Sequence, residues 1–266
     1  MEITTLFRRF ALVPGASTDP GKTLTREVAA HLAAAGALAA GLALALAQML
    51  DLPALYVPAS LAVFLLVAGR AVSGLAAHHP HRRWGDANRV TLGRGVLISL
   101  VGGALAVVPD LATGSLWVLA VLALAALALD GVDGWVARRQ SMASAYGARF
   151  DMGLDTLLTL LLAVLLWLGG EVGAWVLLMG GLRHIFVAAG RIWPALTGDL
   201  PPSQRRRVIC VVQIAVLAAG LTPLVAPPVT SLTAGAALAL LLFSFAVDTV
   251  WLLRHGNPPH IVPSEG

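Results

Sequence analysis

The sequence predicts an all-α protein, a polytopic bundle of helices in a membrane. Of its 266 residues, 58% are hydrophobic and only 12% are charged, and the mean hydropathy is +0.83. Soluble domains carry about 25% charged residues, so this composition is typical of a membrane protein. Apolar stretches of about 20 residues, the length that spans a bilayer, recur along the chain. The basic residues fall between these stretches in the pattern that orients membrane proteins.

The apolar stretches are separated by short turns and by three longer polar links. The turns are rich in Gly, Pro or Asp and lie at residues 51–53, 109–110, 169–171 and 226–228. The longer links cover residues 74–90, 132–151 and 193–206. We therefore expect eight membrane spans, at residues 28–50, 53–73, 91–109, 112–131, 152–169, 172–192, 207–225 and 230–253.

Lysine and arginine lie almost entirely on one side of these predicted spans. They occupy the N-terminal segment 1–27, the three longer links and the tail 254–266, whereas the four remaining connections contain none. By the positive-inside rule, both termini are then cytoplasmic and the protein is a multi-pass protein of the cytoplasmic (inner) membrane. The net charge of +4 and the pI near 10.2 therefore reflect membrane topology, and we expect no nucleic-acid partner.

The link at residues 74–90 combines three histidines, two arginines and a tryptophan, namely His78, His79, His81, Arg82, Arg83 and Trp84. Basic and aromatic residues of this kind favour an interfacial segment that faces anionic headgroups. A metal site built from the histidines is the alternative interpretation.

Four aspartates lie at the cytoplasmic junction between the fourth and fifth spans. At 100° per residue, two helix faces gather acidic and small residues: Asp130, Asp133, Gly134, Ala137 and Arg138 on the first, and Gly147, Asp151 and Asp155 on the second. Two neighbouring antiparallel helices can therefore direct four carboxylates into one cleft. The small residues leave room beside them.

Four carboxylates this close together need positive charge nearby if they are to ionise. Arg138, the one arginine on the first face, cannot balance them, but divalent cations can. Hard oxygen ligands suit Mg²⁺ or Mn²⁺, which complete their shells with water and substrate phosphate. We expect two such ions, because a pair of metals bridging a pyrophosphate is suited to displacing one phosphate ester with another nucleophile.

Two other interpretations of the aspartates remain open. They could cap helices and pair with Arg138, Arg139 and Arg149, although ionisable groups at membrane depth are usually functional. They could also form the conduction site of a divalent-cation transporter. Against this, the acidic residues lie at one junction, and the other spans contain no row of acidic partners at the midplane.

The junction fits the pattern D-x-x-D-G-x-x-A-R-x8-G-x3-D-x3-D and resembles the signature of the CDP-alcohol phosphatidyltransferases, integral membrane enzymes of phospholipid synthesis. All eight fixed positions are filled, which argues against a catalytically dead relative or a structural scaffold. A second family pattern, P-N-x-x-T-x-x-R, is matched at Asn88, Thr91 and Arg94, with Ala87 in place of the proline. The resemblance implies a six-helix catalytic core within residues 74–253, preceded by two additional helices at 28–73.

The resemblance also implies site roles. Asp130, Asp133 and Asp151 would hold the metal, and Asp155 would complete the metal site and act as general base. The CDP part of the donor would contact Asn88, Thr91, Gly134, Ala137, Arg138 and Gly147. The reaction implied is transfer of a phosphatidyl group from a CDP-lipid such as CDP-diacylglycerol to an acceptor hydroxyl, with release of CMP. Members of the family commonly form homodimers, so we expect one here.

The sixth span contains two arginines that bear on the acceptor. Arg183 and Arg191 lie near one helix face, in a run similar to the R-E-x-x-V-x-x-x-R of the family's glycerol-phosphate synthases, with His184 in place of the glutamate. This similarity favours a sugar or polyol phosphate such as glycerol 3-phosphate, with inositol phosphate and a bare alcohol such as choline both open. An ion pair between Arg183 and Asp248 is the structural alternative. Residues 205–207, all arginine, could extend the anionic site or serve as a positive-inside anchor.

Overall fold

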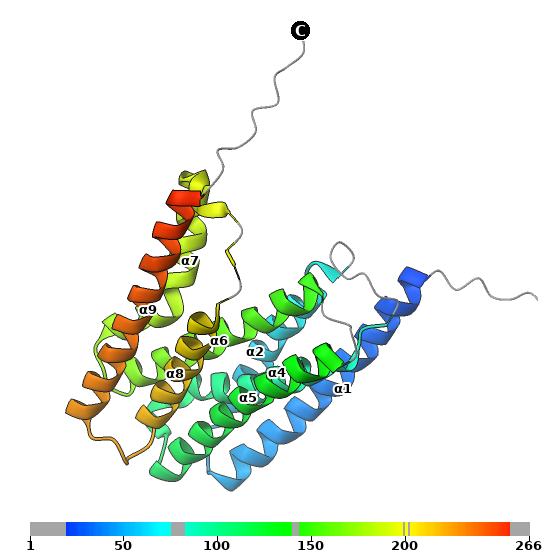
Figure 1. Ribbon diagram of the computed structural model, residues 1–266. Helices are drawn as coiled ribbons and strands as arrows, with labels where there is room; N and C mark the ends of the chain where they lie inside the picture. Colours follow the sequence, from blue (N-terminus) through cyan, green and yellow to red (C-terminus); the bar gives the residue numbers. More distant parts are fainter. Residues whose placement is uncertain (1–19, 76–82, 140–143, 199, 202, 256–266) are drawn as a thin grey trace, which may run out of the picture.

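The computed structural model describes residues 20–75, 83–139, 144–198, 200–201 and 203–255 (Figure 1). Within these residues the protein is all-α, and they contain no strand. The histidines of the link and Arg82 lie outside the described residues, so the proposed interfacial segment and the alternative histidine site stay predictions. The α-helices are α1 (Pro20–Met49), α2 (Tyr56–Val72), α4 (Asp86–Gly103), α5 (Thr113–Arg139), α6 (Ala145–Leu168), α7 (Leu177–Ile192), α8 (Gln204–Gly220) and α9 (Pro227–His255).

Each of the eight predicted spans corresponds to one of these helices, so the predicted fold class is confirmed. Six helical segments of the described chain are long and apolar enough to cross a membrane. Two of them include a short 3-10 helix, since η2 (Ala104–Asp110) continues α4 and η3 (Ala174–Val176) precedes α7. α2 and α8 have 17 residues each, about 25 Å of helix, which is shorter than a hydrocarbon core of about 30 Å.

The helices on either side of the aspartates are longer than the sequence predicts. The expected spans end at residue 131 and resume at 152, whereas α5 continues to Arg139 and α6 already begins at Ala145. Ser144 caps α6 by accepting a hydrogen bond of 3.0 Å from the Gly147 backbone N–H. The polar link 132–151 is therefore mostly helix, and the aspartates lie on rigid elements.

α4 and α6 occupy the centre of the bundle. α4 packs against α1, α2, α5 and α6, and α6 also packs against α7 and α8. Figure 1 shows α1, α2, α4 and α5 together on one side and α7 and α9 on the other, with α8 between. The segment Asp86–Asp110 is the most buried of the six candidate spans, with 72% of its most apolar window inside the protein.

α2 approaches α4 closely because α4 carries glycines where the two helices meet. A Cβ atom added at Gly95 would overlap the side chain of Val67, and one added at Gly103 would overlap that of Ser60. The Tyr56 hydroxyl, buried in the same contact, donates to the Leu100 carbonyl at 2.9 Å. The two N-terminal helices thus share one packed core with the rest of the bundle.

Polar contacts join the same helices near the aspartates. Trp84, expected at the membrane surface, is fully buried in the protein, and its indole N–H donates to the Tyr146 hydroxyl at 3.1 Å. Tyr146 in turn donates to the Ala71 carbonyl. Burial of this tryptophan fixes the entry to α4, because it packs between α1 and α6 through His31 and Phe150.

Candidate active site

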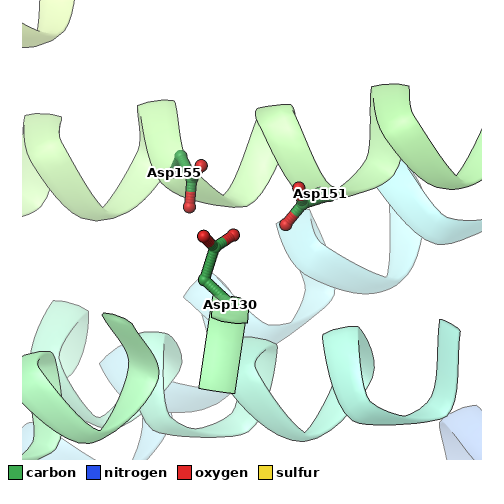
Figure 2. Close-up of side chains that lie close together, drawn as sticks. All are labelled: Asp130, Asp151 and Asp155. Carbon is green, nitrogen blue, oxygen red and sulfur yellow. The ribbon is translucent and has the colours of Figure 1, made fainter. Parts of the chain in front are cut away.

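Three of the four aspartates form one cluster between α5 and α6. Figure 2 shows Asp130 pointing from α5 toward Asp151 and Asp155, which lie one turn apart on α6. One carboxylate oxygen from each of the three lies within 4.8 Å of the others. All three are partly buried. The predicted convergence of two helix faces is therefore confirmed for these residues.

The fourth aspartate, Asp133, is turned toward α4. Its side chain is buried, with 5% of the residue exposed. One of its oxygens accepts a hydrogen bond of 2.9 Å from the Thr91 hydroxyl and one of 3.0 Å from the Arg94 guanidinium. Asp133 borders the cluster, and its other oxygen makes no hydrogen bond with the described residues.

Arg94 of α4 lies among the four carboxylates and forms an ion pair with each of them. Its guanidinium is fully buried and lies 3.0 Å from Asp130 Oδ1 and 3.0 Å from Asp133 Oδ2. The same group pairs with Asp151 and Asp155. Its Nε–H donates to the Ala126 carbonyl at 3.0 Å, which fixes the plane of the guanidinium.

Sequence reasoning did not assign Arg94 to the site. The sequence feature that could have identified Arg94 is its spacing from Thr91. The two residues are three apart and hence lie on one helix face. Arg138, the one arginine on the predicted acidic face of α5, was expected to be too little to balance the carboxylates; its side chain and that of Ala137 lie outside the described residues. With Arg94 counted, four ionised carboxylates still leave a formal charge of −3, so the need for further cations persists.

Three further residues expected to contact CDP, Asn88, Gly134 and Gly147, lie on the helices that form this cluster. Gly147 and Asn88 meet where α6 begins, because a Cβ atom added at Gly147 would lie 3.1 Å from Asn88 Oδ1. Asn88 is buried and donates to the Trp84 carbonyl. Gly134 faces the pocket described below. Their contacts with CDP stay predictions.

A pocket of about 580 Å³ lies beside the aspartates, a volume in the range of small-molecule sites. Helices α5 to α9 contribute to its wall, which is otherwise mostly apolar. The charged residues that line it are Asp130, Asp133, Asp151, Asp155, Arg183, Arg206, Arg207 and Asp248.

The predicted alternative for Arg183, an ion pair with Asp248, is wrong. Asp248 instead pairs with Arg205 and, at 3.2 Å, with Arg206, because the start of α8 lies against the end of α9. Arg183 lines the pocket and makes no hydrogen bond or ion pair with the described residues. Arg191 is exposed and is not on the pocket wall, and its role in acceptor binding stays a prediction.

The donor set fits a divalent cation of the Mg²⁺ type. Asp130, Asp151 and Asp155 offer three hard carboxylate oxygens from two helices. Adjacent ligands of an octahedral Mg²⁺ lie about 3 Å apart and opposite ligands about 4 Å, from bond lengths of about 2.1 Å. The three oxygens lie within 4.8 Å of one another, so small side-chain movements would bring them around one ion. The pocket beside them leaves space for the water and phosphate oxygens that Mg²⁺ usually keeps.

Comparison with known proteins agrees with the geometry of the site. The family model described as CDP-alcohol phosphatidyltransferase matches residues 84–250. Searches of curated proteins and of solved structures found no match for the chain. The matched segment starts just before α4, ends inside α9 and contains the whole aspartate cluster, whereas α1 and α2 precede it. The chain belongs to the CDP-alcohol phosphatidyltransferase family, and it is a multi-pass membrane enzyme of that family.

Proposed function

We propose that the protein transfers a phosphatidyl group from a CDP-lipid such as CDP-diacylglycerol to the hydroxyl of a polyol phosphate. The acceptor oxygen forms a bond to the lipid-bearing phosphorus, and the bond from that phosphorus to the bridging oxygen breaks. CMP leaves with the bridging oxygen. The observation that carries the proposal is the aspartate cluster on the wall of a ligand-sized pocket, in a chain of this family.

Divalent metal supplies the charge that a pyrophosphate donor requires. Two Mg²⁺ or Mn²⁺ ions, held by Asp130, Asp133, Asp151 and Asp155, would neutralise the pyrophosphate when bound. The chain itself contributes Arg94, whose contacts with all four carboxylates support a role in keeping them oriented.

Asp155 is proposed as the general base. It lies on the pocket wall where α6 faces α8, and the thiol of Cys210 contacts its Oδ2 at 3.8 Å. An acceptor hydroxyl bound in the pocket could reach this carboxylate, which would take the proton as the new P–O bond forms. Burial of the carboxylate limits the access of competing water.

The CDP part is proposed to lie against Asn88, Thr91, Gly134, Ala137, Arg138 and Gly147. The small residues among them allow a nucleotide phosphate to approach the helix backbone, and Arg138 would add positive charge. The contact between Asn88 and Gly147 supports this assignment, because it joins the two family patterns at one place.

The acceptor is proposed to carry a phosphate group, as glycerol 3-phosphate does. Arg183 supports this choice, because it lines the pocket without a counter-ion among the described residues. Arg207 lies on the same wall, and an arginine fork suits bidentate phosphate contacts. Arg191 would assist from the end of α7. The alternative is the same chemistry with a non-phosphorylated alcohol.

We further propose that the site faces the cytoplasm, where the nucleotide is in water while the acyl chains stay in the leaflet. The positive-inside distribution of arginine supports this orientation. A homodimer is the expected assembly, by analogy with the family.

The test is CMP release by the purified protein from CDP-diacylglycerol, across a panel of acceptors, with Mg²⁺, Mn²⁺ or EDTA. We expect metal-dependent release that is fastest with a polyol phosphate. Asp151→Asn should lower the rate at least a thousandfold, while Asp110→Asn, at an exposed aspartate away from the pocket, should not change it. A divalent-cation transporter would release no CMP with any acceptor, and full turnover by Asp151→Asn would remove that residue from the mechanism.

A further inference from the structure

Gln213 is buried on the wall of the active-site pocket, and its amide nitrogen has no hydrogen-bond partner among the described residues. It is 5% exposed and lies on α8 within the apolar run Val208–Gly220. Its Nε2 makes no hydrogen bond with any described residue. Two other buried side-chain atoms of the described chain also lack partners, on Ser60 and Arg205, but neither residue lines this pocket.

An unpaired amide at this depth costs free energy. Burying an amide donor without a hydrogen bond costs about 1–3 kcal/mol by mutational measures. A leucine of similar size would avoid that cost in an apolar helix. The described residues offer the Nε2 of this amide no hydrogen bond that offsets the cost, so a ligand in the pocket is the natural partner.

The position of Gln213 relative to the aspartates follows from the register of α6 and α8. The Cys210 thiol contacts Asp155, and a Cβ atom added at Gly220 would lie 3.4 Å from the Leu166 side chain. The two helices therefore run in the same direction. Gln213 lies one turn beyond Cys210, at about the level of Thr159, which is one turn beyond Asp155.

This deeper part of the pocket wall is polar but uncharged. Thr159 is 5% exposed and lines the pocket, and its hydroxyl donates to the Asp155 carbonyl at 2.8 Å, which leaves the hydroxyl oxygen as an acceptor. The amide of Gln213 can both donate and accept. Groups of this kind match a neutral hydroxyl, whereas a phosphate matches Arg183 and Arg207 elsewhere on the wall.

We propose that Gln213, together with Thr159, binds a hydroxyl group of a polyhydroxylated acceptor, distinct from the hydroxyl that attacks. This inference rests on the proposed function, and it makes Gln213 a specificity-determining residue. A site built to hydrogen-bond a substrate hydroxyl discriminates strongly against an analogue that lacks it, because the analogue leaves the site's polar groups unpaired.

The experiment compares two acceptors in the CMP-release assay with the Gln213→Leu variant. Glycerol 3-phosphate has a second hydroxyl, and 3-hydroxypropyl phosphate keeps the attacking hydroxyl and the phosphate but lacks it. We expect the wild-type protein to prefer glycerol 3-phosphate by at least tenfold in kcat/KM, and Gln213→Leu to reduce that ratio to near one. The KM for CDP-diacylglycerol should not change. If myo-inositol 1-phosphate is the preferred polyol phosphate, the same comparison uses its deoxy analogues.

Thermal unfolding in detergent separates binding from a structural role. Gln213→Leu should keep or raise the melting temperature, because it removes an unpaired buried amide. Gln204→Leu, at the exposed first residue of α8, is the matched control and should preserve the acceptor preference.

Each contrary result has a different meaning. An unchanged acceptor ratio in Gln213→Leu, with wild-type turnover intact, would overturn the subsite and leave the proposed function standing. Preference of the wild-type protein for choline over both polyol phosphates would also overturn it. Absence of CMP release with every acceptor would refute the proposed function, and the subsite with it.

Discussion

Arg94 is expected to supply the positive charge that holds the metal-free aspartate cluster together. We consider the change Arg94→Gln, which removes that charge and keeps a polar side chain. Arg94 is fully buried and pairs with four carboxylates. Removing one partner of a buried ion pair costs about 3–5 kcal/mol, because the remaining charge is buried without compensation. We expect a loss at the upper end of this range, about 5 kcal/mol, in EDTA.

A divalent cation should reverse much of this loss. At about 5 Å and an effective dielectric constant of about 20, a unit charge and a divalent ion repel by about 7 kcal/mol. Relaxation of the guanidinium will reduce that figure, but even about 1.4 kcal/mol corresponds to a tenfold change in affinity. Arg94→Gln should therefore bind Mn²⁺ at least tenfold more tightly than the wild-type protein and gain more stability from it.

The assay measures thermal unfolding in detergent with EDTA or with Mg²⁺, together with Mn²⁺ titration followed by electron paramagnetic resonance. Arg89→Gln is the matched control on the same helix, since Arg89 is 43% exposed and forms surface pairs with Glu27 and Asp86. Such pairs contribute about 0–1 kcal/mol. Equal destabilisation of Arg94→Gln in EDTA and in Mg²⁺, with unchanged Mn²⁺ affinity, would refute the reasoning and leave Arg94 a packing residue.

Two further predictions concern the acceptor and the N-terminal helices. Arg183→Ala should raise the KM for glycerol 3-phosphate at least tenfold and leave the KM for CDP-diacylglycerol unchanged, with Arg254→Ala, at an exposed residue near the end of α9, as control. An unchanged KM for every anionic acceptor would exclude Arg183 from binding. Gly103→Ala should destabilise the protein by about 1–3 kcal/mol because its Cβ would overlap Ser60, whereas Gly93→Ala, with open space around it, should be neutral or stabilising. Equal melting temperatures for the two variants would show that α2 does not pack on α4 as described.

The helices could be predicted from hydropathy, but their ends near the site could not. Hydropathy counts charge without regard to the helix face on which it falls, so it ended the fourth span at residue 131. In the structure α5 continues to Arg139, and its aspartates Asp130 and Asp133 line the pocket instead of facing the lipid. Helical periodicity does account for the helix face, and it correctly predicted that Asp130, Asp151 and Asp155 converge.

Contacts between helices distant in sequence could not be predicted. The position of Arg94 among the carboxylates depends on how α4 packs against α5 and α6, and only its spacing from Thr91 indicated a shared face. Likewise, the choice of partner for Asp248 depends on where α8 begins. Its first turn carries Arg205 and Arg206 next to that carboxylate, and Arg183 is left facing the pocket.

The N-terminal helix α2, which lies outside the family-matched segment, packs against α6, the helix that carries Asp151 and Asp155. Arg70 of α2 donates to the Arg149 carbonyl at 2.7 Å, and a Cβ atom added at Gly153 would lie 2.7 Å from its Nε. Gly153 lies between Asp151 and Asp155 in sequence, so it is on the opposite face of α6. The face of α6 that carries the carboxylates is therefore in contact with Arg94 of α4, and its back is in contact with Arg70 of α2. Because both faces are in contact, α6 cannot rotate to turn its aspartates out of the cluster without breaking the contact with α2. α2 therefore helps to hold Asp151 and Asp155 in the cluster.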